Sequence, residues 1–305
     1  MRHIIFVSNE HKAWMNQLLP WINILREKFR DFNWDFVNIN TVKHLRTNDL
    51  VVLYGDPHVI DYPKIHSKNV IVMHDTPLFD CDIYKENPDW LWLPSSRLNK
   101  EIIEECGTKN YGDILHKPMI IPDVGEVEKR FDYVVNLTQP FRKGDDKLAK
   151  ILKQVQREVS MLLIMPKSNW KNFENIKNVK ITFREPKYKN YTDVLIEMKS
   201  AKTMIFPSYI EGIGLPPIEA YKLGVDIIMS DGSAHNEFVR GVMVPTVDID
   251  AVIEPNLKKH FMYQYWDEEY MYKVIEDDIH EKPTLLEPDV FDAVGLGSKL
   301  ISYFR

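Results

Sequence analysis

Two glutamates flank a glycine-containing loop in the second half of the sequence. Glu211 precedes the loop Gly212–Leu215, and Glu219 follows it after two prolines. Proline suits the first turn of a helix, where its missing N–H costs no hydrogen bond, so we expect a helix that begins at one of these prolines and ends at Gly224. Free amides before such a helix bind anions, and a carboxylate accepts hydrogen bonds from paired sugar hydroxyls. The loop is therefore a candidate site for a sugar joined to a diphosphate.

Short apolar runs alternate with helix-like stretches along the chain. This alternation is typical of layered α/β domains, and several runs are apolar on both faces, as in parallel strands covered by helices on each side. In the first half, strands are expected at residues 4–7, 35–38, 50–54, 70–73, 90–93 and 119–121. In the second half, they are expected at residues 133–137, 161–165, 179–183, 203–206, 226–230 and 242–244. The loop then follows the strand that ends at Phe206, at the sheet edge where open α/β sheets bind ligands.

The length of 305 residues corresponds to about two domains of roughly 100–200 residues each. The turn Pro122–Gly125 and the charged stretch that follows it form a reasonable connection between domains. We therefore expect a first domain over residues 1–125 and a second over residues 126–260. Residues 261–305 are expected to form a helical tail that returns toward the first domain.

The composition argues against several classes of protein. The formal net charge is −6, so the broad positive field of a protein that binds nucleic acid or anionic lipid is missing. The two cysteines, Cys81 and Cys106, form no C-x-x-C pair, which fits a reducing compartment and argues against a disulfide scaffold or a cysteine-rich zinc module. No apolar run approaches the ~20 residues of a membrane-spanning helix. We expect a cytoplasmic chain with neither a membrane span nor a nucleic-acid partner.

The segment Glu211–Glu219, E-G-I-G-L-P-P-I-E, resembles the E-x7-E motif of retaining glycosyltransferases of the GT-B fold, especially the large family numbered 4 within group 1. Phe131–Gly144 is similar to the first strand of that family's donor domain with its R-K-G turn, and Ala201–Ser208 to its strand that ends in P-S. In the first half, Val70–Asp75 resembles the strand that ends in H-D. The resemblance implies an α/β protein with two Rossmann-like, doubly wound domains that face each other across a cleft.

The same resemblance implies roles for the matching side chains. Glu219 would bind the ribose hydroxyls of a nucleotide, and Glu211 would bind the hydroxyls of the transferred sugar. Lys143 would neutralise the diphosphate, and His74 would line the sugar pocket from the opposite domain. Backbone contacts to sugar and phosphate would come from Gly212, Ile213, Gly214 and Leu215.

One position departs from the family pattern. Leu137 stands six residues before Lys143, where family members usually carry an arginine. One contact to the diphosphate is therefore missing, and Arg142 is the residue expected to supply positive charge from a neighbouring position.

The expected reaction is transfer of a hexose from a nucleotide-diphosphate sugar, such as a UDP- or GDP-hexose, to an acceptor hydroxyl. By resemblance the anomeric configuration is retained, and neither a metal nor another cofactor is required. The acceptor stays open among glycans, lipids, proteins and small molecules, and so does a homodimer. Two alternatives are a catalytically degenerate protein of the same fold that only binds a nucleotide or glycan, which Leu137 favours, and a sugar-nucleotide epimerase.

Overall fold

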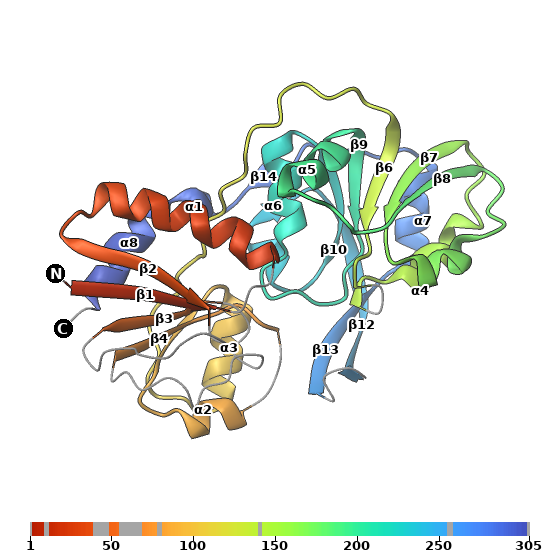
Figure 1. The fold of residues 1–305 in the computed structure, drawn as a ribbon. Coiled ribbons are helices and arrows are strands. Elements are labelled where there is room, and N and C mark those ends of the chain that lie inside the picture. The colour runs from red at the N-terminus through yellow and green to blue at the C-terminus, as the bar shows by residue number, and fades with distance from the viewer. Residues whose placement is uncertain are drawn as a thin grey trace. The chain divides into compact units, whose positions relative to one another are not determined.

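The computed structural model describes residues 2–8, 12–38, 49–54, 69–77, 81–139, 142–254 and 259–303. The chain divides into two compact units, which are drawn in Figure 1. Unit 1 comprises Met1–Ile120 and Pro288–Arg305, and unit 2 comprises Ile121–Glu287. The first of these units is therefore built from both ends of the chain.

Unit 1 is built on a parallel sheet whose described strands follow the order β2-β1-β3-β4-β5. The strands are β1 (Arg2–Ser8), β2 (Phe32–Asn38), β3 (Leu50–Tyr54), β4 (Asn69–His74) and β5 (Leu91–Pro94). All five residues of β3 are buried, so this strand is apolar on both faces, as the sequence predicts for a doubly wound sheet.

Helices cover both faces of this sheet, as Figure 1 shows. On one face, α1 (Lys12–Lys28) and α8 (Ala293–Ser302) pack with strand residues such as Phe6 in a core that includes Leu25 and Leu300. On the other face, α2 (Asp82–Glu86) and α3 (Arg97–Glu105) pack with Val7 and its neighbours. The sheet is therefore covered on both sides by helices distant in sequence.

Unit 2 contains a second sheet with the order β13-β12-β10-β9-β6-β7-β8. Its strands are β6 (Phe131–Asn136), β7 (Val159–Ile164), β8 (Val179–Arg184), β9 (Ala201–Phe206), β10 (Asp226–Asp231), β12 (Val242–Glu254) and β13 (Lys259–Trp266). Neighbouring strands run parallel except β12 and β13, which form an antiparallel hairpin. A short antiparallel pair, β11 (Val239–Arg240) with β14 (Thr284–Leu285), lies apart from this sheet.

The helices of unit 2 also lie on both faces of its sheet (Figure 1). The α5 helix (Tyr191–Lys199) and the α6 helix (Leu215–Leu223) contact each other and β9, whereas α4 (Asp145–Leu152) contacts α7 (Glu268–Glu276). Short 3-10 helices are η5 (Lys167–Phe173) and η6 (Ala234–Glu237) in unit 2, and η7 (Pro288–Phe291) in unit 1. Both units are therefore doubly wound and Rossmann-like, as the sequence predicts.

The bounds of some elements differ from the expectation. The expected strand at residues 119–121 does not form, because the backbone of Met119 donates to the carbonyl of Val290 rather than joining a sheet. The expected helical tail at residues 261–305 is divided between the units: it starts within β13 and continues through α7 in unit 2, whereas α8 packs in unit 1. The division after Ile120 replaces the boundary expected at residue 125.

The two cysteines are joined, contrary to the expectation of reduced thiols. Cys81 and Cys106 form a disulfide, and their Cα atoms lie 4.9 Å apart. Cys81 caps the start of α2 and Cys106 caps the end of α3, so the bond ties together two helices on the same face of the first sheet. The pairing depends on where the fold places these helix ends, which lie 25 residues apart in the sequence.

In the described part of the chain, no helix combines the length and the hydropathy that crossing a bilayer requires.

The two ends of the chain should be coupled in stability through α8. Leu300 is fully buried in the core of unit 1, so Leu300→Ala should lower the free energy of unfolding by about 2–5 kcal/mol. Val294 lies on the same helix with 38% of its surface exposed, and Val294→Ala should change stability by less than about 1 kcal/mol. Urea unfolding of both variants measures the difference. Equal losses would contradict the packing of α8 as described.

Candidate functional site

The loop between β9 and α6 is shaped by a glycine that no other residue can replace without strain. Gly214 caps α6 with φ of 81°, in the left-handed region that side chains disfavour. A Cβ atom placed there would lie 2.4 Å from Cβ of His235. The helix begins at Leu215, places its prolines in the first turn and ends at the cap Gly224, so the sequence prediction is confirmed to within a residue.

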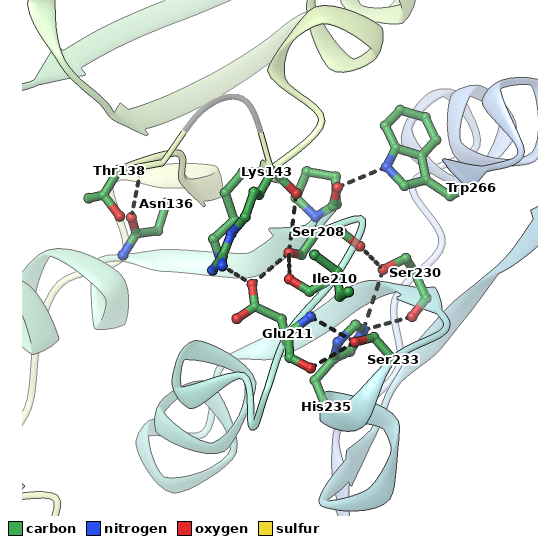
Figure 2. Close-up of polar contacts among 12 residues, drawn as sticks. Asn136, Thr138, Lys143, Ser208, Ile210, Glu211, Ser230, Ser233, His235 and Trp266 are labelled. Atoms are coloured by element: carbon green, nitrogen blue, oxygen red, sulfur yellow. Dashed lines mark hydrogen bonds and ion pairs between the residues drawn. The ribbon is translucent and has the colours of Figure 1, made fainter. Parts of the chain in front are cut away.

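Glu211 lies between two side chains that both contact the same carboxylate oxygen (Figure 2). Nζ of Lys143 forms an ion pair with Oε1, and Oγ of Ser208 donates to Oε1 at 2.6 Å. The side chains of Lys143 and Glu211 are only 8% and 10% exposed. Among the residues that the structure describes, no hydrogen bond reaches the other oxygen, Oε2. Within those residues, the ion pair and the hydrogen bond therefore use only one of the two oxygens of Glu211.

The environment of this pair favours its ionised form. Burial alone would raise the pKa of Glu211, but Lys143 and Arg142 together with the Ser208 hydroxyl hold it below its ordinary value. Burial lowers the pKa of Lys143, and the negative charge of Glu211 opposes that shift. The ammonium also lies 4.3 Å from the centre of the Phe206 ring, whose face attracts a cation. Glu211 is accordingly a carboxylate at neutral pH.

A serine from a different loop holds the backbone of Glu211. Oγ of Ser233 accepts a hydrogen bond from the Glu211 amide at 2.7 Å and donates one to its carbonyl at 2.8 Å (Figure 2). Ser233 itself has φ of 69° and ψ of −179°, a backbone region that belongs almost only to glycine. The hydrogen bonds to Glu211 therefore help to hold Ser233 in a strained conformation. Nothing in the sequence pattern pointed to this residue.

The second glutamate lies one turn into α6 rather than in its first turn. The hydroxyl of Tyr191 on α5 donates to Oε1 of Glu219 at 2.6 Å. Burial raises the pKa of Glu219 to about 7, although the hydrogen bond from Tyr191 and the charge of Lys143 act in the opposite direction. Glu219 is therefore divided between its acid and carboxylate forms near neutral pH, whereas Glu211 is charged.

The turn that carries Lys143 packs directly on the loop that carries Glu211. The backbone amide of Tyr209 donates to the carbonyl of Arg142 at 2.8 Å. Gly144 has φ of 63°, and a Cβ atom at this residue would lie 2.7 Å from the carbonyl oxygen of Pro207. The two loops meet because β6 and β9 are adjacent parallel strands, whose carboxyl ends lie at the same sheet edge.

Cationic charge reaches the site from Arg142 as well as Lys143. The charge of Arg142 acts on both Glu211 and Lys143. Leu137 is fully buried, and its amide donates to the carbonyl of Ile164, so this position brings no charge to the site. The structure thus brings together every predicted site residue of unit 2: Arg142, Lys143, Glu211, Gly212, Ile213, Gly214, Leu215 and Glu219.

The loop also presents backbone donors. Within the described residues, the amides of residues 212–215 donate to no carbonyl. They lie at the start of α6, where the helix dipole favours an anion. The site therefore combines anion-binding amides, two cationic side chains and two carboxylates, which can recognise an anion and hydroxyl groups together. In the same described residues, no group of three or more His, Cys, Asp or Glu is arranged to hold a metal ion.

His235 supports the loop from below, and it was not identified from the sequence. Its Nε2 lies 2.9 Å from the carbonyl oxygen of Ser230 (Figure 2). Its Cβ lies so close to Gly214 that a Cβ atom at Gly214 would be only 2.4 Å away. Burial lowers its pKa to about 4, so the ring is neutral at physiological pH. A neutral ring adds packing without adding charge beside Lys143.

His74 belongs to unit 1, where it ends β4. The side chain is fully buried, and its Nε2 lies 3.1 Å from the hydroxyl of Tyr84. The next residue, Asp75, forms an ion pair of 2.6 Å with Lys117, which is also buried. The expected role of His74 toward a sugar stays a prediction.

Removing the charge of Glu219 should change how stability depends on pH. In the folded protein the pKa of Glu219 is about 7, whereas in the unfolded chain it returns to its ordinary value of 4.5. Stability contributed by this proton is therefore present below pH 4.5 and lost as pH rises through 7. Between pH 4.5 and pH 8, the free energy of unfolding of Glu219→Gln should therefore rise by up to roughly 3 kcal/mol relative to that of wild type.

Urea unfolding at the two pH values measures this gain. Glu269→Gln, which removes a solvent-exposed glutamate paired with Lys273, serves as the control and should follow wild type. A constant difference between Glu219→Gln and wild type across this range would show that Glu219 titrates normally.

Two substitutions at Ser233 separate strain from hydrogen bonding. Ser233→Gly and Ser233→Ala both remove the hydroxyl that holds Glu211, but only glycine relieves the backbone strain at φ of 69°. We expect wild type to be the most stable, followed by Ser233→Gly and then by Ser233→Ala. The free energies of unfolding of the two variants should differ by about 1–3 kcal/mol. Thermal or urea unfolding tests the order, and alanine equal to glycine would argue against a strained Ser233.

Comparison with known proteins finds a match for part of the chain. Residues 134–254, which contain most of the site, match the family model described as glycosyl transferases group 1. No curated protein matches the chain in sequence.

Several solved structures share the fold over nearly the whole chain. HepE of Anabaena, in complex with UDP and glucose, has a TM-score of 0.57 at 11% identity and covers 100% of this chain and 97% of its own. Sucrose-phosphate synthase from Thermosynechococcus elongatus has a TM-score of 0.57 at 11% identity, and the match covers 100% of this chain and 95% of the synthase. WaaG, a glycosyltransferase involved in lipopolysaccharide biosynthesis, has a TM-score of 0.55 at 9% identity, and the match covers 99% of this chain and 94% of WaaG.

At sequence identities this low, the structural similarity shows a shared fold and nothing about a shared activity. The chain therefore has the GT-B fold with two Rossmann-like units, and its residues 134–254 are similar to the family described as glycosyl transferases group 1.

Proposed function

We propose that this chain transfers a hexose from a nucleotide-diphosphate sugar to an acceptor hydroxyl, with retention of the anomeric configuration. The observation that carries the proposal is the ion pair of Lys143 and Glu211 beside the amides of residues 212–215, which donate to no carbonyl in the part of the chain that the structure describes. One site thereby offers a cation and N–H donors to a diphosphate, and a carboxylate to sugar hydroxyls. The group 1 domain and the GT-B fold support nucleotide-sugar glycosyl transfer in general.

Each group has a defined part in the proposed reaction. Negative charge grows on the leaving diphosphate in the transition state, so the ammonium of Lys143 and the amino end of α6 stabilise that state most. Glu211 accepts hydrogen bonds from the hydroxyls of the sugar, and Glu219 accepts them from the ribose. Arg142 contributes positive charge in place of the arginine missing at Leu137.

The proposed chemical step occurs on one face of the sugar. The bond between the anomeric carbon and the phosphate oxygen breaks, and a bond from the acceptor oxygen to the same carbon forms. The proton of the acceptor hydroxyl moves to the leaving phosphate oxygen. No protein nucleophile takes part, and protein charges and amides stabilise the leaving diphosphate without a metal ion or cofactor. The acceptor is a glycan, lipid, protein or small molecule with a free hydroxyl.

A second function is favoured by one observation. Leu137 is a buried leucine at the position where the family usually carries an arginine, so one contact to the diphosphate is lost. This loss favours a protein that binds a nucleotide without turnover. Such a chain would keep the carboxylates and amides of the site while transferring no sugar.

The test is a panel of UDP-, GDP- and ADP-hexoses incubated with glycan, lipid, peptide and small-molecule acceptors. Release of nucleoside diphosphate and the mass of the product measure transfer, and the anomeric configuration of the product is read by NMR. We expect transfer by wild type and a loss of roughly 100-fold or more in Glu211→Ala.

Glu269→Gln is the control, because Glu269 is exposed and forms an ion pair with Lys273 on α7. Binding of a donor without turnover by any acceptor would support the binding protein instead. Consumption of donor without any acceptor would support an epimerase. Full transfer by Glu211→Ala would remove Glu211 from its assigned role.

A further inference from the structure

The carboxylate of Glu219 has a single hydrogen-bond donor in the part of the chain that the structure describes. The hydroxyl of Tyr191 donates to its Oε1 at 2.6 Å, whereas the nearest cation that acts on it, Lys143, forms its ion pair with Glu211. Glu219 is only 6% exposed, so little water surrounds the group. A buried carboxylate depends on hydrogen-bond donors to stay charged. Within the described residues, Tyr191 supplies that donor.

The backbone that carries Tyr191 is held in place by the packing of its helix. Tyr191 is the first residue of α5, and α5 contacts α6, the helix that carries Glu219. Leu195 and Met198, further along α5, are fully buried. Two packed helices therefore set the distance between the hydroxyl of Tyr191 and the carboxylate of Glu219.

The hydrogen bond from Tyr191 leaves acceptor capacity on Glu219. A carboxylate has two oxygens with about four lone-pair sites, and one hydroxyl proton uses one of them. In the proposed function the paired hydroxyls of a ribose donate to Glu219, and they can do so while Tyr191 keeps its bond. Tyr191 would therefore act on the ligand through Glu219 and not compete with it.

The same hydrogen bond favours the charged form of Glu219. Burial raises the pKa of Glu219 to about 7, and two groups act in the opposite direction: the hydroxyl of Tyr191 from α5 and the charge of Lys143 from the turn after β6. No other titratable or charged side chain among the described residues contributes to this shift. Without the hydroxyl of Tyr191, the pKa of Glu219 would rise further.

We propose that Tyr191 is a positioning residue that holds the carboxylate of Glu219 for the ribose hydroxyls of a nucleoside diphosphate. The inference rests on the proposed function, in which Glu219 accepts these hydrogen bonds, and it adds a residue outside the motif from Glu211 to Glu219. A charged acceptor forms stronger hydrogen bonds than a neutral one. Tyr191 thereby extends ribose recognition down to neutral pH.

Replacing Tyr191 should change how ribose recognition depends on pH. Tyr191→Phe removes the hydroxyl and keeps the ring, so near neutral pH Glu219 should be mostly protonated. Its preference for a nucleoside diphosphate over the 2′,3′-dideoxy analogue should then fall about 3-fold or more relative to wild type. At about pH 9 Glu219 is charged in both proteins, and the variant should recover most of the preference. The pH of half-maximal preference should move up by ~1 pH unit.

Isothermal titration of the full chain with UDP, GDP and ADP identifies the nucleotide that binds most tightly. Titration of that nucleotide and of its 2′,3′-dideoxy analogue, from about pH 6 to about pH 9, then gives the preference. The ratio of the two affinities cancels the titration of the phosphates, which both ligands share.

Tyr111→Phe is the matched control. Its hydroxyl also donates to a glutamate, Oε1 of Glu104 at 2.8 Å, but in a solvent-exposed pair of unit 1, so its preference should stay within about twofold of wild type. Glu219→Gln is a second variant whose side chain is neutral at every pH. Its preference should be low throughout the pH range and should not recover at high pH.

The outcomes separate this inference from the proposed function. If Tyr191→Phe keeps the wild-type preference at every pH, or loses it equally at every pH, the inference is overturned and donor binding still supports the proposed function. A wild type that does not distinguish the nucleotide from its dideoxy analogue, or a loss in Tyr111→Phe equal to that in Tyr191→Phe, would overturn the inference in the same way. If no nucleoside diphosphate binds wild type, both are overturned.

Discussion

The ion pair between Lys143 and Glu211 is the contact on which the candidate site depends. It joins the turn after β6 to the loop after β9, and it places a cation beside backbone amides that already favour an anion. Because the pair is buried, neither charge can be left without a partner. The hydroxyl groups of Ser208 and Ser233 meet this requirement. Ser208 donates to the carboxylate of Glu211 and Ser233 holds its backbone, so Glu211 stays within reach of Lys143.

The sheet of unit 2 makes this contact possible. Strands β6 and β9 are hydrogen-bonded neighbours that run parallel, so the two loops leave the sheet at the same edge although 68 residues separate Lys143 from Glu211. Glycine permits the close approach at two points, Gly144 against Pro207 and Gly214 against His235. The neutral ring of His235 fills the space beneath the loop without disturbing the charges above it.

The two glutamates of the motif have different electrostatic surroundings. Glu211 faces cations and stays ionised, whereas Glu219 lies on α6 against Tyr191 of α5 and has a pKa that burial raises to about 7. Lys143 holds Glu211 as a carboxylate, whereas Glu219, which accepts a hydrogen bond from the hydroxyl of Tyr191, changes its charge near neutral pH. The spacing of Glu211 and Glu219 in the sequence does not indicate this difference between their surroundings.

The sequence alone determined the fold class, the alternation of strands and helices, and the loop with its two glutamates. These features are local: apolar runs, proline in a first turn and glycine at a helix end act over a few residues, and the resemblance to retaining GT-B glycosyltransferases rests on the same short segments. Only the tertiary structure decided which distant groups meet. The clamp by Ser233, the support by His235, the Cys81–Cys106 disulfide and the return of α8 to unit 1 all join residues that are separated in the chain. Such contacts depend on strand order and on the packing of whole helices, which no short pattern of residues encodes.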